Sequence, residues 1–390
     1  MVYLDNNATT APHPAVVDAM LPFLRDAWHN PSSGYRAAKE VRRAIETARA
    51  QVAALINAEP DEIVFTSGGT ESTNMALKWL ARLVGRKSGR VVTSAIEHSA
   101  VLRPCETFAE VGYPVERVGV SADGRLLLDQ FAAACARARD GGGFASVMWA
   151  NNETGVIQPI FDACAIAKEA GLAFHTDAIQ AAGKTPVDVR AVAADFLSLS
   201  AHKFYGPKGI GALYVRGGVR VEPLMRGGGQ EAGRRGGTEN VPGIIGMGAA
   251  AAIAAHTNSE PVRALRDAFE TALVTGISGV RPNGNAGHRL PNTCHLSFEG
   301  CDAGGLLILL DEYGVQCSAG SACMTGQQEP SHVQRAMGIP ENQAKTSLRF
   351  SLSNTTCAED ISLAAAAVNR AVAKLRSVQG GGVGPVVVYS

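Results

Sequence analysis

Short apolar runs alternate with longer segments of helical periodicity between residues 62 and 216. The apolar runs, which predict buried strands, cover residues 62–67, 90–95, 145–150, 172–178, 195–201 and 211–216. Patterns with apolar positions three and four residues apart occupy 70–84 and 160–171, and a similar face runs along 41–56. This alternation predicts an α/β fold with a mostly parallel sheet that helices cover on both faces.

The pattern changes after about residue 256. Helical segments at 260–275 and 302–314 are interleaved with expected strands at 292–298 and 346–353, which is typical of a smaller α+β domain. We therefore expect an N-terminal segment (1–14) packed with the small domain, a large domain (15–255), a small C-terminal domain (256–379) and a Gly-rich tail (380–390).

Composition narrows the class of protein. The 36 basic and 36 acidic residues balance, so direct binding of nucleic acid is not expected. The longest apolar run, 243–255, is too short for a membrane span and predicts a buried helix. The first residues lack a secretory signal pattern and the eight cysteines form no CxxC pair. Together these features predict a cytoplasmic protein with no metal site.

A glycine turn is the first candidate for chemistry. In "FTSGGTESTN" (65–74) an expected strand runs into Gly68 and Gly69, and Thr70 then opens a helix. The free backbone N–H groups at a helix start suit a phosphate. An ordinary strand-to-helix turn capped by a threonine explains the same residues, so this stretch alone does not decide between the two.

Two strand ends carry the next candidates. Asp177 ends an apolar run, where open α/β sheets bind their ligands, although a helix cap or an arginine partner would also explain it. Lys203 follows another run, with Ser200 and His202 beside it; a surface lysine is the ordinary alternative. A phosphate turn, a strand-end aspartate and a strand-end lysine together are the ingredients of a pyridoxal phosphate site.

Two cysteines stand out in "VQCSAGSACMTG" (315–326). A metal site, a disulfide, core packing and a nucleophile are all open for the pair. Cys317 ends an apolar run and is expected to be a small buried side chain. Cys323 follows a Gly-Ser pair and is the candidate nucleophile.

Several motifs, in this order, resemble those of the cysteine desulfurases: YLDNNATT, SGGTESTN, EHSAV, NNETG, HTDAIQ, SAHKFYGPKGIG, GGGQE followed by RRGGTEN, SAGSAC and LRFSLS. These are pyridoxal phosphate enzymes of the class V aminotransferase group with the fold-type I architecture. The resemblance spans residues 3 to about 355 and is nearest the branch with the longer catalytic loop, which includes the NifS and IscS types. It implies a seven-stranded sheet in the large domain and a homodimer.

The resemblance assigns roles to individual residues. Lys203 matches the lysine that holds the cofactor, Asp177 the partner of its pyridine nitrogen, and His98 the imidazole stacked on its ring, also a proton carrier. Gln180 matches the donor to the cofactor's phenolic oxygen. The remaining matched cofactor contacts are Gly69, Thr70, Asn152, Ser200, His202 and Thr238, the last of which reaches the neighbouring subunit's phosphate. Arg349, with Asn152, matches the site of the substrate carboxylate, and Cys323 matches the catalytic cysteine.

The implied reaction converts L-cysteine to L-alanine. Its sulfur would be held as a persulfide on Cys323 and passed to an acceptor, such as an iron–sulfur scaffold, for iron–sulfur cluster or thio-cofactor biosynthesis. A selenocysteine lyase or another class V aminotransferase would use the same lysine and aspartate, and a sulfur- or iron-binding scaffold is a third alternative. Two departures stand out: Gly236 and Gly237 occur where a serine is expected before Gly-Thr, and the Gly-rich tail does not resemble an acceptor-docking segment.

Overall fold

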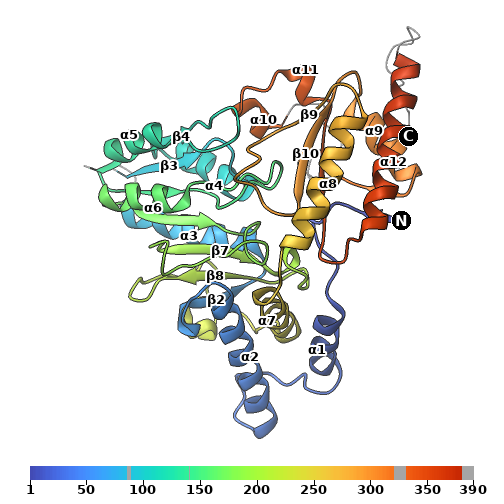
Figure 1. Cartoon of the computed structure of the whole chain (residues 1–390). Helices are drawn as coiled ribbons and strands as arrows, with labels where there is room; N and C mark the ends of the chain where they lie inside the picture. Colours follow the sequence, from blue (N-terminus) through green and yellow to red (C-terminus); the bar gives the residue numbers. More distant parts are fainter. Residues whose placement is uncertain (86–88, 140, 320–330, 380–390) are drawn as a thin grey trace.

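The computed structural model describes residues 1–85, 89–139, 141–319 and 331–379 (Figure 1). Its strands are β1 (Val2–Tyr3), β2 (Ile63–Thr66), β3 (Arg90–Ser94), β4 (Val115–Val118), β5 (Gly143–Ser146), β6 (Ala173–Asp177), β7 (Phe196–Ser200), β8 (Gly211–Val215), β9 (Val280–Pro282), β10 (Thr293–Phe298), β11 (Val315–Gln316) and β12 (Ser347–Ser351). Its α-helices are α1 (Pro14–Arg25), α2 (Arg36–Leu55), α3 (Gly69–Val84), α4 (Ser99–Glu110), α5 (Leu128–Arg139), α6 (Ile160–Glu169), α7 (Val241–Ala255), α8 (Glu260–Gly276), α9 (Ala303–Glu312), α10 (His332–Ala336), α11 (Glu341–Ala344) and α12 (Ala358–Gln379). Short 3₁₀ turns, η1 (Pro60–Glu62), η2 (Ala201–Lys203) and η3 (Gln230–Gly233), complete the described elements.

Seven strands form one sheet in the order β2-β8-β7-β6-β5-β3-β4. Neighbouring strands are parallel except for β8, which is antiparallel to β2 and β7. The predicted α/β class with a mostly parallel sheet is therefore confirmed. In such a sheet the carboxyl ends of β3, β5, β6 and β7 meet at one edge.

In the large sheet, two details of the strand prediction are wrong. The strand expected at 145–150 begins earlier, at Gly143, because glycines 142 and 143 hide its start from an apolar pattern. The edge strand β4 was not predicted, because Glu116 and Arg117 interrupt its apolar run. An edge strand has one exposed side, so polar residues are tolerated there.

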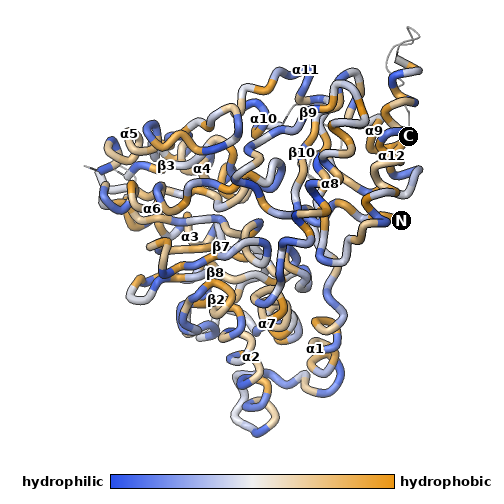
Figure 2. Tube along the Cα trace, in the orientation of Figure 1, coloured by the Kyte–Doolittle hydropathy of each residue, from blue (hydrophilic) through white to orange (hydrophobic). Residues whose placement is uncertain are grey.

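Helices cover both faces of the sheet. On one face α2, α5, α6 and α7 pack over residues such as Phe65 and Val92, and on the other α3 and α4 pack over Val64 and Val91. Adjacent residues thus point to opposite, buried faces, which is why these strands appear as continuous apolar runs. The predicted buried helix at 243–255 is α7, whose turns are mostly orange and tan in Figure 2.

A second cluster of buried residues lies beyond α7. Strands β12, β10 and β9 form an antiparallel sheet, and α8, α9 and α12 pack with it. The N-terminal residues Val2 and Leu4 belong to this cluster, and β1 pairs in parallel with β11. The N-terminus accordingly lies beside α12 in Figure 1. From there the chain runs toward the sheet edge where the parallel strands end.

Contacts between the two parts of the chain lie at that edge. The turn after β5 meets the segment before β10, where the N–H of Leu290 donates to the carbonyl of Gly155 at 2.8 Å. No helix within the described ranges is both long and apolar enough to cross a bilayer.

Candidate cofactor and substrate site

Asp177 is the last residue of β6 and is buried, with 4% of its surface exposed. Its carboxylate accepts a hydrogen bond from the N–H of Ile179 at 3.0 Å. Burial raises the pKa of Asp177 to about 6, although this hydrogen bond and the nearby Lys203 act to lower it. A buried carboxylate favours a cationic partner, because the attraction between opposite charges offsets the hydration that the carboxylate loses on burial.

His98 caps the start of α4, directly after β3. Its Nδ1 accepts a hydrogen bond from the N–H of Ala100 at 3.1 Å, which assigns the ring proton of the neutral imidazole to Nε2. Burial, together with the nearby charges of Lys203 and His332, lowers the pKa of His98 to about 4. The ring is therefore neutral near pH 7.

Lys203 lies in η2, immediately after β7. Its Nζ donates to the carbonyl oxygens of Asn7 at 2.7 Å and Ala8 at 2.8 Å. On the same turn, Nδ1 of His202 lies 3.1 Å from Oγ1 of Thr9. The strand places the lysine at the sheet edge, and the N-terminal segment orients its amine.

Asn7 links several parts of the site and is 1% exposed. Its Nδ2 donates to Oγ1 of Thr293 at 2.8 Å and to the carbonyl of Asn152 at 3.2 Å, while its Oδ1 accepts from Nδ2 of Asn292 at 3.1 Å. The side chain thus joins the turn after β5 to the start of β10. Asn7 belongs to the YLDNNATT motif, but no role for it was predicted from the sequence.

Gln180 lies beyond β6 and is 5% exposed. Its Nε2 donates to the carbonyl of Asn7 at 2.9 Å, and its Oε1 accepts from Nζ of Lys184 at 2.6 Å. Lys184 also donates to Oδ1 of Asn7 at 3.0 Å. Lys184 was not among the predicted site residues, and nothing in its local sequence distinguishes it from a surface lysine.

Arg349, in the middle of β12, is 1% exposed. Its NH2 donates to Oδ1 of Asp5 at 2.6 Å and its NH1 to the carbonyl of Asn152 at 3.0 Å. Asn151 shapes the turn that presents Asn152, because its Oδ1 accepts from the N–H groups of residues 153 and 154. The structure therefore brings Arg349 together with the carbonyl of Asn152 and with Asp5, and the binding of a substrate carboxylate there stays a prediction.

The glycine turn has the form expected of a phosphate site. Gly69 opens α3 and approaches Ile179 so closely that a Cβ at position 69 would lie 2.2 Å from its Cδ1. The N–H of Ser72 donates to the carbonyl of Gly68 at 3.1 Å, so the N–H groups before it precede the first helical hydrogen bond. Ser200, at the end of β7, lies 3.4 Å from the same Cβ position. Thr70 is exposed at this helix start.

Thr238 is placed differently from the other candidates. It is exposed in the loop before α7, and within the described part of this single chain no hydrogen bond joins it to Lys203 or Asp177. The loop is held by Arg235, whose Nε donates to Oε1 of Glu71 at 3.0 Å. The neighbouring departure from the family pattern has a steric basis: a Cβ at Gly236 would lie 2.6 Å from the backbone nitrogen of Gly227.

Cys323 lies outside the described residues, as does the 380–390 tail. Cys317 is half-buried and packs against the cluster that contains Val2. Burial raises the pKa of its thiol, and the Asp5 carboxylate adds to this effect. A protonated thiol is a poor nucleophile, which agrees with a packing role for Cys317.

Glu97 is a further buried carboxyl group. It precedes His98 in the EHSAV motif, but it was not among the predicted site residues. Its Oε1 accepts from Oγ of Ser94 at 2.6 Å and from the N–H of Met148 at 2.9 Å. Burial raises the pKa of Glu97 to about 8, and Asp177 contributes in the same direction. It ties the end of β3 to the segment after β5.

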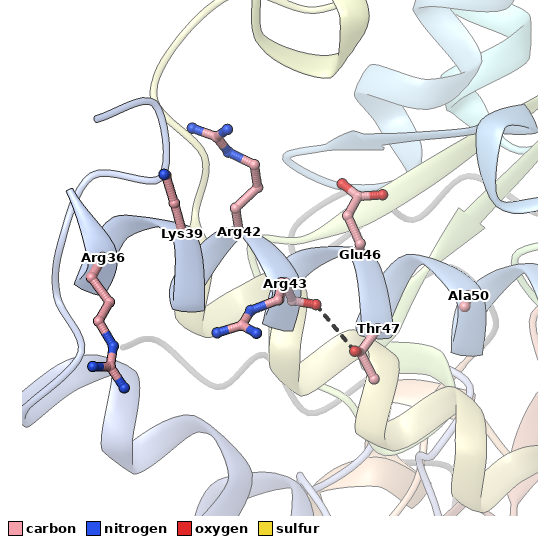
Figure 3. Close-up of a pocket in the computed structure, with 7 residues that line it drawn as sticks. All are labelled: Arg36, Lys39, Arg42, Arg43, Glu46, Thr47 and Ala50. Atoms are coloured by element: carbon pink, nitrogen blue, oxygen red, sulfur yellow. Dashed lines mark hydrogen bonds between the residues drawn. The ribbon is translucent and has the colours of Figure 1, made fainter. Parts of the chain in front are cut away.

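A hollow of about 1030 Å³ lies along α2, away from these residues (Figure 3). Its lining is Arg36, Lys39, Arg42, Arg43, Glu46, Thr47 and Ala50. It contains none of the strand-end side chains and no candidate nucleophile. Its size therefore does not make it the reactive site.

Comparison with known proteins agrees with this arrangement. The family model described as aminotransferase class-V matches residues 2–363. This chain belongs to that family. A cysteine desulfurase of Gluconacetobacter diazotrophicus is 49% identical over 97% of this chain and 94% of its own length, and the cysteine desulfurase NifS of Azotobacter vinelandii is 45% identical over the same shares. A solved structure titled NifS-like protein has a TM-score of 0.87 at 34% identity and covers 97% of this chain and 99% of its own.

Members of this family are pyridoxal phosphate enzymes, and the described residues fit that cofactor. Asp177 supplies a buried carboxylate with a raised pKa, Lys203 an amine beside it, and Gly69 a helix start whose N–H groups precede the first helical hydrogen bond. These groups suit a pyridine nitrogen, an aldehyde carbon and a phosphate, respectively. No cluster of three or more metal-ligating side chains occurs among the residues that the structure describes.

Proposed function

We propose that the chain is a cysteine desulfurase that converts L-cysteine to L-alanine and transfers the sulfur to an acceptor through Cys323. The observation that carries the proposal is that Asp177 and Lys203, at the strand ends of the large sheet, lie near Arg349 of β12, which donates to the carbonyl of Asn152 in the turn after β5. A cofactor anchor, a proton-holding carboxyl group and a carboxylate receptor are the groups that an amino-acid substrate needs in such an enzyme.

In the proposed site, Lys203 would hold the cofactor, and Asp177 would keep a proton on the pyridine nitrogen. His98 would stack on the ring, while Asn152 and Gln180 would contact its polar edge. Gly69, Thr70, Ser200 and His202 would hold the phosphate. When bound, pyridoxal phosphate supplies an electron sink for the bonds at the substrate Cα.

Arg349 binds the substrate carboxylate through the fork of its guanidinium group. Asp5 and the Asn152 carbonyl hold that group in place, at 2.6 and 3.0 Å. Lys203 then removes the Cα proton as a general base, and His98 carries a proton near the reacting atoms. The depressed pKa of His98, about 4, keeps its imidazole neutral near pH 7, with Nε2 carrying the ring proton.

Sulfur transfer is assigned to Cys323. Its thiolate attacks the substrate sulfur, so that an S–S bond forms while the substrate Cβ–S bond breaks. The carbon skeleton takes up protons and leaves as alanine, and the sulfur remains on Cys323 as a persulfide. The net change is L-cysteine plus a thiol giving L-alanine plus a persulfide, which needs no external oxidant.

We also propose a homodimer. Large apolar side chains of the α1–α2 region are exposed in the single chain, among them Trp28 at 70% and Leu24 at 60%. Exposed apolar side chains gathered in one region favour an interface. Thr238, exposed before α7, would then reach the phosphate in the neighbouring subunit. The sulfur acceptor is proposed to be a protein such as an iron–sulfur scaffold.

The test is to incubate the cofactor-loaded protein with L-cysteine and to measure alanine and protein-bound sulfane sulfur together. We expect equal amounts of both, and Cys323→Ala should abolish both products while the visible absorbance of the lysine-bound cofactor remains. Cys357→Ala is the matched control, because Cys357 is an exposed cysteine that directly precedes α12. Alanine formation that survives Cys323→Ala would contradict the role of this cysteine.

A further inference from the structure

Lys184 has no assigned role, and its surroundings are unusual for a lysine. Its amine is in the turn after β6, where it donates to Oε1 of Gln180 at 2.6 Å and to Oδ1 of Asn7 at 3.0 Å. Both acceptors are almost fully buried, at 5% and 1% exposed. Lysine side chains are mostly exposed, so a lysine with two buried amide acceptors needs an explanation.

The contact with Lys184 determines which way the Gln180 amide faces. A lysine amine that donates a hydrogen can do so only to the oxygen of a side-chain amide, not to its nitrogen. Oε1 therefore faces Lys184, and Nε2 faces the carbonyl of Asn7 at 2.9 Å. If the amide were rotated by half a turn, its Nε2 would face Nζ of Lys184, which is also a donor. Its Oε1 would then face the carbonyl oxygen of Asn7, which is also an acceptor.

The donor end of Gln180 is thereby directed toward the reactive lysine. The Asn7 carbonyl that accepts from Nε2 of Gln180 also accepts from Nζ of Lys203, at 2.7 Å. The chain Lys184–Gln180–Asn7–Lys203 is continuous, with every hydrogen bond between 2.6 and 2.9 Å.

Three basic side chains, Lys184, Lys203 and Arg349, converge on this part of the site. Burial lowers the pKa of Lys184 well below its ordinary value, and the charges of Lys203 and Arg349 contribute to the shift. Positive charges and amide donors gathered in buried surroundings are suited to an anionic oxygen.

We propose that Lys184 is a positioning residue for the cofactor: it holds the Gln180 amide with its N–H toward the cofactor's phenolic oxygen. The inference rests on the proposed function, since it assumes that Lys203 carries the cofactor beside Gln180. It adds a residue that acts through Gln180 and does not itself contact the reacting atoms. The competing explanation is that Lys184 only ties Asn7 to the large sheet, in which case it would affect stability alone.

Equilibrium titration of the cofactor-free protein with pyridoxal phosphate separates the two explanations. A hydrogen bond that involves a charged group contributes enough for Lys184→Met to weaken cofactor affinity about tenfold. Lys184→Arg keeps a donor and a charge and should retain most of the affinity. The pH midpoint of the bound cofactor's visible absorbance should rise in Lys184→Met, because a nearby positive charge lowers the pKa of a cationic group.

A double-mutant cycle tests whether Lys184 acts through Gln180. If it does, Lys184→Met combined with Gln180→Ala should bind the cofactor no more weakly than Gln180→Ala alone. The matched control is Lys168→Met, which removes a half-buried lysine paired with Asp195 at the other end of the sheet. It should lower the melting temperature and leave affinity and absorbance unchanged.

Two outcomes overturn the inference while the proposed function stands. One is a wild-type protein that binds the cofactor and a Lys184→Met variant with unchanged affinity and absorbance. The other is a double variant whose loss of cofactor affinity equals the product of the losses in the two single variants, which would mean that Lys184 and Gln180 act independently. A wild-type protein that takes up no pyridoxal phosphate would overturn both the inference and the proposed function.

Discussion

The site is made of two unlike regions, the strand ends of the large sheet and the irregular N-terminal segment from residue 3 to residue 10. The strand ends supply Asp177, Ser200 and the turn of Lys203, all placed by regular backbone hydrogen bonds. The N-terminal segment supplies backbone carbonyls and the side chains of Asp5 and Asn7, which reach partners far away in the sequence.

The difference separates two tasks. The strand ends provide the groups that hold the cofactor and move protons in the proposed reaction. The N-terminal segment orients these groups from the opposite side. A rigid sheet edge can place a side chain, but the remaining hydrogen bonds of that side chain must come from another element. Substitutions in the first region should therefore act on chemistry, and those in the second on orientation.

The largest expected effect is in the strand-end region. Asp177→Asn keeps the shape of the side chain but cannot hold the pyridine nitrogen protonated, so kcat with L-cysteine should fall at least about a hundredfold. Cofactor content and alanine formation are the measurements. Asp195→Asn, a carboxylate at the other end of β7, is the control and should leave kcat unchanged. An Asp177→Asn enzyme of nearly normal kcat would remove the distinction between the two regions.

An intermediate effect is expected in the N-terminal segment. Asp5→Asn removes the charge that holds NH2 of Arg349 at 2.6 Å, so the substrate carboxylate should meet a poorly oriented guanidinium group. We expect KM for L-cysteine to rise about tenfold, with a smaller change in kcat. Steady-state kinetics at several L-cysteine concentrations provide the measurement. A lower KM would instead mean that Asp5 competes with the substrate for Arg349.

The last expected effect is on folding stability and not on catalysis, and it concerns the pH dependence of the strand-end region. Glu97 has a pKa of about 8 when folded, above its ordinary value, so the unfolded chain releases this proton at lower pH than the folded protein. Its contribution to the free energy of unfolding is present below about pH 4.5 and is lost as the pH rises through 8, by at most about 1.4 kcal/mol per pH unit.

Glu97→Gln keeps the acceptor for Ser94 and Met148 but does not titrate. The stability of the cofactor-free wild type relative to this variant should therefore fall between pH 4.5 and pH 8, as measured by urea unfolding at several pH values. A difference that does not vary with pH would mean that Glu97 titrates normally.

Much of the fold was accessible from the sequence. The buried strands β2, β6, β7 and β8 were predicted within one or two residues, because strands covered on both faces are apolar throughout. The strand β5 was misplaced and β4 missed, since glycine at one and charged residues at the other removed that signal. The positions of Asp177 and Lys203 at strand ends followed directly from the same runs.

The supporting residues were not accessible in this way. Asn7, Lys184 and Glu97 are ordinary polar residues locally, and each acquires its character from partners on other elements. Thr238 is the opposite case, because the family resemblance gave it a role that the single chain does not test. Its proposed partner lies in another subunit, and Thr238 is exposed in the single chain.

The sequence by itself determined the alternation of strands and helices, the sheet edge where the candidate groups lie, and the motifs that indicate the family. These features are local, since hydrophobic periodicity and turn residues act over a few positions. Only the tertiary structure decided that Lys184 orients Gln180, that Asp5 holds Arg349, and that burial raises the pKa of Asp177 and lowers that of His98. Hydrogen-bond partners and desolvation depend on which distant segments meet, and no pattern within a short stretch of sequence records that.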